Sequence, residues 1–214
     1  MTITVLKAFD GMNLRRDPDT GQDLFYPVRR EDTFLTKTIF ANGSSKRAQN
    51  MRVYHLGDYY APKTLGELRP ILDVLAESPH DLIIRQKYKN YSIGERVERA
   101  KGLYEYTESN IICIDIDELI LPSHVSNTDI AEQAKYACNI LHKCSDNKIP
   151  DDVEYIAQGS SSAGFSNKVK LHIWICNVED ISHSAAKSFF KNVNKIYKEK
   201  YSSKENLVDL ALYS

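Results

Sequence analysis

Residues 110–118 read Asn-Ile-Ile-Cys-Ile-Asp-Ile-Asp-Glu, a run that stays apolar until Asp115. A short apolar run rich in β-branched residues is typical of a strand covered on both faces. Because side chains alternate along a strand, Asp115 and Asp117 should leave one face while Ile114 and Ile116 leave the other. Two carboxylates about 7 Å apart repel each other unless a cation lies between them, and a divalent ion is the simplest candidate. The alternative is a strand that ends in two solvated acids.

The composition is that of an ordinary globular protein, and it limits the function classes. The 214 residues carry 28 Lys and Arg against 29 Asp and Glu, a net charge of −1 that excludes a uniformly basic nucleic-acid binder. No apolar run is long enough to span a bilayer, and the first residues lack a signal-peptide pattern. The four cysteines show no Cys-x-x-Cys spacing, which indicates a reducing compartment. We therefore expect a cytoplasmic protein that does not act in a membrane.

The order of elements after residue 105 predicts an α+β fold. Asp129 and Glu132 form a capping box that starts a helix of about 16 residues. The expected elements are a strand over 110–117, this helix, strands over 153–158 and 168–176, a helix over 184–200 and a strand over 207–210. The order β-α-β-β-α-β is the split βαβ or ferredoxin-like arrangement, in which the first and third strands are central and both helices cover one face.

Residues 1–105 predict a separate α/β module, and residues 106–214 contain the ferredoxin-like module. A capping box of Thr64 and Glu67 predicts the start of a helix that ends near residue 78. Four strands are also expected in the first module, over residues 2–6, 36–41, 51–56 and 81–86.

The strand over residues 168–176 supplies side chains that could join the paired aspartates. Its two faces are Val169, Leu171, Ile173 and Ile175 on one side, and Lys168, Lys170, His172 and Trp174 on the other. If the apolar face packs under the helices, Lys170 and His172 share the open face with Asp115 and Asp117. Asp209, on the last strand, can join them from the opposite flank.

Three carboxylates on adjacent strands suit two-metal phosphoryl or nucleotidyl transfer, in which ions about 3.5–4 Å apart hold the attacking and leaving oxygens. Mg²⁺ takes most of its ligands from water and phosphates, so two or three acids suffice. Lys170 and His172 would then donate hydrogen bonds to a triphosphate. The loop over residues 159–164 offers backbone and hydroxyl donors to phosphate, or is simply a flexible connection. Its hydroxyls belong to Ser160, Ser161 and Ser162.

These residues resemble the three motifs of the archaeo-eukaryotic primase superfamily. Asp115-Ile116-Asp117 resembles its paired-acid motif, Lys170-Leu171-His172 its histidine motif, and Val208-Asp209 its final hydrophobic-Asp motif. With the Ser-Ser-Ser-Ala-Gly loop, they look most like the primase-polymerase domains of phages, plasmids and integrated elements. The resemblance covers about residues 105–214 and implies an RRM-like catalytic module that forms one primase-polymerase domain with the module before it.

The resemblance implies an enzyme that makes or extends primers on a DNA template from nucleoside triphosphates. It implies that Asp115, Asp117 and Asp209 hold two divalent ions, Mg²⁺ or Mn²⁺, and that His172 contacts the phosphates of the incoming nucleotide. Many relatives have Ser where this chain has Lys170, so the role of this lysine stays open. Relatives continue beyond the third motif, so we expect the N-terminal part of a longer protein with a fused or associated helicase.

A basic tract and a cysteine pair provide further candidates. Basic residues from position 85 to 101 interleave with tyrosines, a pattern that suits phosphate contacts and base stacking, or simply a solvated surface. The candidate DNA contacts are Arg85, Lys87, Arg96 and Arg99.

Cys138, His142 and Cys144 could suggest a zinc site, but they lack a convincing fourth ligand. We therefore expect buried helix cysteines and no zinc site.

Other functions remain open from the sequence. A haloacid-dehalogenase-type phosphatase also has an apolar strand ending in Asp-x-Asp, but its sheet is parallel and doubly wound. A non-catalytic single-strand-binding module usually displays aromatic side chains on its open face, not acids. A replication-initiator nuclease of the His-hydrophobic-His type requires a histidine where Lys170 stands.

Overall fold

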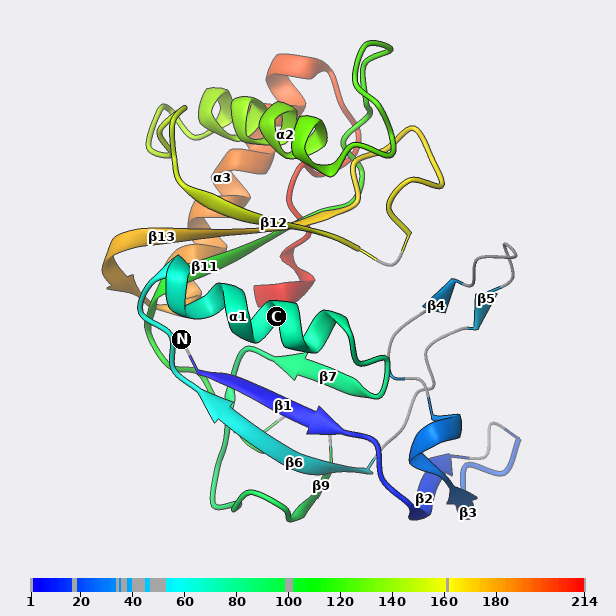
Figure 1. Ribbon diagram of the computed structural model, residues 1–214. Coiled ribbons are helices and arrows are strands. Elements are labelled where there is room, and N and C mark those ends of the chain that lie inside the picture. Colours follow the sequence, from blue (N-terminus) through cyan, green and yellow to red (C-terminus); the bar gives the residue numbers. More distant parts are fainter. Residues whose placement is uncertain are drawn as a thin grey trace. The chain divides into compact units, whose positions relative to one another are not determined.

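The computed structural model describes residues 2–16, 19–33, 35, 38–39, 45–46, 53–98, 102–160 and 162–213. Its contacts divide the chain into an N-terminal unit, Met1–Pro62 with Gly66–Thr107, and a C-terminal unit, Lys63–Leu65 with Glu108–Ser214. The sequence placed the boundary between residues 105 and 106. The fold class is α+β, as expected, with α-helices and antiparallel sheets (Figure 1). No helix in the described ranges has the length and apolar character needed to cross a bilayer.

The N-terminal unit is built on a four-stranded antiparallel sheet of order β7-β1-β6-β9. These strands are β7 (Asp81–Ile84), β1 (Ile3–Lys7), β6 (Val53–Tyr60) and β9 (Arg96–Glu98). The helix expected from Thr64 is α1 (Leu65–Ala76). The strands expected over 2–6, 51–56 and 81–86 are confirmed as β1, β6 and β7, with ends that differ from the prediction by at most four residues.

Shorter pairs of strands complete this unit. They are β2 (Gly11–Arg16) with β3 (Asp23–Val28), β4 (Thr38–Ile39) with β5 (Ser45–Lys46), and β8 (Lys87–Tyr88) with β10 (Tyr104–Glu105), and a 3-10 turn, η1, spans Arg30–Asp32. Only residues 38–39 of the strand expected over 36–41 lie within the described residues. The core of the unit contains Leu6, Tyr54, Leu56, Tyr88 and Val97.

The C-terminal unit contains β11 (Ser109–Ile116), α2 (Ile130–Cys144), β12 (Tyr155–Gly159), β13 (Leu171–Ile181), α3 (His183–Tyr201) and the 3-10 turn η2 (Leu210–Tyr213). Its sheet has the order β11-β13-β12, and both pairs are antiparallel. The expected central pairing of the first and third strands is therefore confirmed. This sheet has the strand order of a split βαβ unit without its fourth strand.

Strand register explains which residues face the helices. Ile114 pairs with Ile173 and Ile116 with Leu171, so these four side chains share one face. They belong to one core cluster with side chains of both helices: Ala134, Ala137, Cys138 and Leu141 of α2, and Ala186, Phe190, Val193 and Tyr197 of α3. The expectation that both helices cover the same face is confirmed.

Helix α2 begins as the sequence predicts, with one difference. The Asp129 carboxylate accepts a hydrogen bond from the Glu132 N–H at 2.9 Å. The Glu132 carboxylate, however, accepts from the Ser126 N–H at 3.2 Å instead of completing a reciprocal capping box. Glu132 therefore ties the preceding loop to the first turn of the helix.

The prediction of a fourth strand over residues 207–210 is wrong. The Val208 N–H and carbonyl are both hydrogen-bonded by the Asn194 side chain, at 2.8 and 2.9 Å, so they are not available to a sheet ladder. The Asp209 carboxylate then accepts from the Ala211 N–H at 2.8 Å, and the chain turns into η2. One strand-like bond remains, from the Asp209 N–H to the Asp115 carbonyl at 2.9 Å. Asp209 therefore still lies beside β11.

The face opposite the helices is less open than the sequence predicts. Cys113 pairs with Trp174 on this face, and each is only 3 % exposed. Farther along this face lie Asp115, which is largely buried, and His172, which is partly exposed, and on the other side of Trp174 the Cys176 side chain is exposed. Trp174 is therefore a buried residue and not part of an exposed surface.

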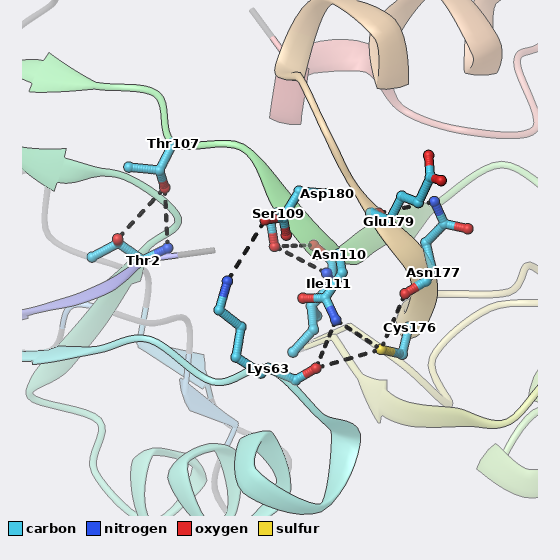
Figure 2. Close-up of polar contacts among 10 residues, drawn as sticks. All are labelled: Thr2, Lys63, Thr107, Ser109, Asn110, Ile111, Cys176, Asn177, Glu179 and Asp180. Carbon is cyan, nitrogen blue, oxygen red and sulfur yellow. Dashed lines mark hydrogen bonds and ion pairs between the residues drawn. The ribbon is translucent and has the colours of Figure 1, made fainter.

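Residues 63–65 belong to the C-terminal unit because Lys63 bonds to its sheet. The Asn110 amide donates to the Lys63 carbonyl at 2.7 Å, and the Cys176 thiol lies 3.6 Å from the same oxygen. The Lys63 ammonium lies 3.7 Å from the Asp180 carboxylate (Figure 2). These contacts fix the segment that precedes α1 to β11 and β13.

Burial should make the cysteines differ in their reactivity toward alkylating reagents. Cys138 and Cys144 are buried, as expected, whereas Cys176 is exposed. Burial raises the pKa of Cys138 from 9.0 to about 12, so its thiolate fraction near pH 8 falls roughly a thousandfold. Iodoacetamide should therefore modify Cys176 in minutes and Cys138 at least 100-fold more slowly, as measured by peptide mass spectrometry. In urea both should react alike, and equal rates in the native protein would contradict the packing described.

Candidate metal and nucleotide site

Three carboxylates converge where β11 ends. Asp115, Asp117 and Asp209 each offer one oxygen, and these oxygens lie within 4.8 Å of one another. Asp115 is the last but one residue of β11, Asp117 follows the strand directly, and Asp209 is held beside them by its backbone bond to Asp115. Carboxylates this close repel one another unless cations reduce the local charge. Their hard oxygen ligands suit Mg²⁺ or Mn²⁺ better than softer metals.

His172 lies directly across from Asp115 on the neighbouring strand. The two residues are register partners, and the imidazole Nε2 is 3.6 Å from Asp115 Oδ1. The Asp115 side chain is 13 % exposed and the His172 side chain 35 %. The imidazole therefore lies at the more accessible rim of the carboxylate cluster, where it can reach a bound anion.

Lys170 brings a positive charge to the same rim. Its ammonium lies 3.5 Å from Asp117 and 3.6 Å from Glu118, and the side chain is only 18 % exposed. Glu118 also binds Lys168 directly. The hydrogen bond from Lys168 lowers the pKa of Glu118, and the same bond raises the pKa of Lys168. Glu118 thus stays ionised and holds two lysines next to the aspartates.

The serine loop lies next to this rim, but most of its backbone donors are used internally. The Ser160 N–H donates to the Lys170 carbonyl at 2.8 Å, and the Ala163 N–H donates to the Ser160 carbonyl at 2.9 Å. The Ser162 N–H donates to the Ser160 hydroxyl at 3.4 Å. These three N–H groups are therefore not available to phosphate, and the hydroxyls of Ser160 and Ser162 lie 3.3 Å apart, within hydrogen-bonding distance of each other. Ser161 lies outside the described residues.

Two glycines allow the loop to turn close to α2. A Cβ atom at Gly159 would lie 3.1 Å from the Ile130 side chain and 3.2 Å from that of Ala163. Gly164 has a φ of +83°, which favours glycine, and its carbonyl accepts from Asn127 at 3.1 Å. The loop is therefore packed against the start of α2 and is more than a flexible connection.

Within the described part of the basic tract, several of the candidate cations and aromatic rings have partners inside the protein. Lys87 lies 3.9 Å from Glu105, and the Arg96 guanidinium lies 4.8 Å from the centre of the Phe9 ring. Tyr88 is buried and packs edge-on against Tyr104, so it is not available to stack on a base. Arg85 directly follows β7, and Arg99 lies outside the described residues.

Two polar residues important for the geometry were missed from the sequence. Glu118 follows the paired acids directly, and it could have been noticed as a partner for the lysines at 168 and 170. Asn194 falls between Val193 and Tyr197 on the apolar face of α3 and is only 4 % exposed. A lone amide on such a face is a detectable signal, because buried polar groups are nearly always hydrogen-bonded.

Comparison with known proteins adds one relative. The chain is 25 % identical over 213 residues to a protein of Escherichia phage T5 named "Putative replication origin binding protein". The match covers 99 % of this chain and 22 % of the phage protein, so the chain spans about a fifth of the length of that relative. No family model matches the chain. No solved structure matches it.

Proposed function

We propose that the chain carries the catalytic domain of a DNA primase or polymerase that acts in replication of a phage, plasmid or integrated element. The observation that supports this most is the convergence of the Asp115, Asp117 and Asp209 oxygens, beside His172 and Lys170. The similarity to a phage protein named for binding a replication origin supports the replication role. The proposed partners are a DNA template, a primer, nucleoside triphosphates and a fused or associated helicase.

The proposed roles follow from position and charge. Asp115, Asp117 and Asp209 hold the divalent ions. Bound there, Mg²⁺ or Mn²⁺ stabilises the charge on the attacking and leaving oxygens of an in-line displacement. Lys170 and His172, at the accessible rim, donate to the triphosphate oxygens, and Glu118 keeps Lys170 in place.

Metal binding can be tested without any activity assay. A ligand at 100 times its dissociation constant stabilises the folded state by about 2.7 kcal/mol. Saturating Mn²⁺ should therefore raise the melting temperature of the wild type by several degrees, as measured by calorimetry. Asp209→Asn should lose most of this shift, because it removes one of three converging ligands. Asp151→Asn, at an exposed turn, should keep it. An unchanged shift in Asp209→Asn would contradict the assignment.

A second candidate is a nucleic-acid-binding module without catalysis, which the name of the phage relative favours. In that case the chain binds DNA but incorporates no nucleotide. Nucleotide incorporation separates the two functions, and metal-free binding tests the metal assignment: if the acids are metal ligands, Asp115→Ala with Asp117→Ala should bind DNA equally or more tightly, because negative charge is removed. Weaker binding by this variant would contradict the metal assignment.

The phosphatase alternative does not fit the fold. A haloacid-dehalogenase-type enzyme places its Asp-x-Asp strand in a parallel, doubly wound sheet. Here β11 pairs with β13, and β13 with β12, in antiparallel fashion. The strand that carries Asp115 therefore lacks the parallel neighbours of that architecture within the described sheet.

A further inference from the structure

Helix α3 is strongly basic in a chain that is nearly neutral. Its 19 residues contain one glutamate, Glu199, whereas the whole chain has a net charge of −1. The basic side chains on the helix are Lys187, Lys191, Lys195, Lys198 and Lys200. The positive charge is therefore concentrated on one helix. The arrangement of the lysines on the helix surface decides whether several of them can bind the same ligand.

Three of these lysines lie on one side of the helix. Lys191, Lys195 and Lys198 follow an i, i+4, i+7 spacing, which aligns side chains along a helix. Seven residues at the helical rise extend about 10 Å. The aligned lysines lie next to Asn194, at the edge of the helix face that packs Phe190 into the core.

A groove of about 360 Å³ runs along these lysines. It is lined on α3 by Lys191, Lys195, Lys198 and Glu199, and after the helix by Asn206 and by Leu210, the first residue of η2. The Asn194 side chain also lines the groove, and its two bonds to Val208 hold that segment against the helix. These bonds hold one wall of the groove against α3 at Val208, and the groove reaches Leu210, the residue that follows Asp209.

The lysines of the groove carry charge that the described residues do not neutralise. Ion pairs are present elsewhere, such as Lys63 with Asp180, but none joins Lys191, Lys195 or Lys198 to a carboxylate in the described part of the chain. Glu199 alone opposes them among the lining residues. A row of uncompensated ammonium groups attracts a polyanion whose charges repeat along its length.

We propose that this groove binds the phosphate backbone of a nucleic-acid strand, as a contact separate from the carboxylate site. This inference rests on the proposed function for one point only, that the polyanion is a nucleic acid. About 10 Å of helix corresponds to roughly three nucleotides at the 3.4 Å repeat of one strand. Asn206 adds a neutral donor, and Leu210 adds an apolar contact. A strand held here passes the residue next to Asp209, and so would be anchored near the proposed chemistry.

The test compares two triple variants of the full chain. Lys191→Gln, Lys195→Gln and Lys198→Gln together remove the charges of the groove. The control, Lys135→Gln, Lys143→Gln and Lys148→Gln together, removes three exposed lysines from the same unit. Binding of a fluorescent single-stranded oligonucleotide is measured by anisotropy in EDTA, from 50 to 300 mM NaCl. Thermal unfolding checks that both variants remain folded.

The groove variant should bind at least about tenfold more weakly at low salt. The slope of log K against log salt should fall by about 2, because each lost phosphate contact on a single strand contributes about 0.7. The control should change affinity less than about twofold. Equal losses in both variants, or no loss in the groove variant, would overturn the proposal, and so would a wild type that binds no DNA.

Two further arms identify the source of the phosphate and separate this proposal from the enzymatic one. Tripolyphosphate should compete poorly with the oligonucleotide at equal phosphate concentration; effective competition would mean a site for free polyphosphate. Asp115→Asn should retain DNA binding in EDTA. If the groove variant loses affinity while no preparation incorporates nucleotides, the groove proposal stands and the polymerase proposal fails. If nucleotides are incorporated but the groove variant binds DNA normally, the polymerase proposal stands and the groove proposal fails.

Discussion

Replacement of Asp115 or Asp117 by asparagine should reduce template-directed nucleotide incorporation at least a thousandfold without unfolding the protein. A thousandfold loss corresponds to about 4 kcal/mol of transition-state stabilisation, the scale expected when metal-held oxygens are lost. Asparagine keeps the shape of the side chain and removes one of three mutually repelling charges. The melting temperature should therefore stay the same or rise slightly.

The measurement is extension of a labelled primer with Mg²⁺ or Mn²⁺ and all four nucleotides, in the deoxy and ribo series. Asp151→Asn, which removes an exposed acid from the same unit, should retain wild-type activity. His172→Ala should also lose activity while still binding Mn²⁺, because we assign it to the triphosphate and not to the metal. Retained synthesis in both aspartate variants would refute the proposed mechanism.

Replacement of Asn194 by alanine should destabilise the protein by about 2–4 kcal/mol and also weaken metal binding. The amide makes two hydrogen bonds to Val208, at 2.8 and 2.9 Å, and lies in the core. Its loss leaves a buried N–H and a buried carbonyl without these partners, and each costs about 1–3 kcal/mol. Because Asp209 follows Val208, loss of this anchor should also release the third carboxylate from the other two.

Denaturant unfolding measures the first effect, and the Mn²⁺-induced shift in melting temperature measures the second. Asn192→Ala is the matched control, because Asn192 is exposed on the same helix two residues earlier. It should change the free energy of unfolding by less than about 0.5 kcal/mol. If Asn194→Ala lowers stability but keeps the full Mn²⁺ shift, then Asn194 supports the core and does not position Asp209.

Local patterns predicted much of the C-terminal unit because they express the geometry of the backbone. The alternation around Ile114 and Asp115 assigns each side chain to a face of the sheet. The same alternation placed His172 and Lys170 on the face of the aspartates. In the structure His172 pairs with Asp115, and the Lys170 ammonium lies 3.5 Å from Asp117. The helices were expected from capping residues and apolar spacing, and their ends differ from the prediction by one or two residues.

Residues that make long-range contacts were predicted less well. The segment around Asp209 was expected to be a strand because it is apolar, but the side chain of Asn194 bonds to Val208 and replaces the ladder. Alternation placed Trp174 on the same face as His172 but did not show what packs over it; in the structure it is buried. In the serine loop, composition indicated the donors but not that the N–H groups of Ser160, Ser162 and Ala163 bond within the loop and to the Lys170 carbonyl.

The sequence by itself determined which side chains can share a face, because alternation along a strand and spacing along a helix are properties of a few neighbouring residues. It therefore identified Asp115, Asp117, Lys170 and His172 as members of one surface. The tertiary structure alone decided how near Asp209 comes to them, because that distance depends on the hydrogen bonds that join Val208 to Asn194, 14 residues before Val208. It also decided that the lysines of α3 line a groove, because the second wall comes from a segment that follows the helix.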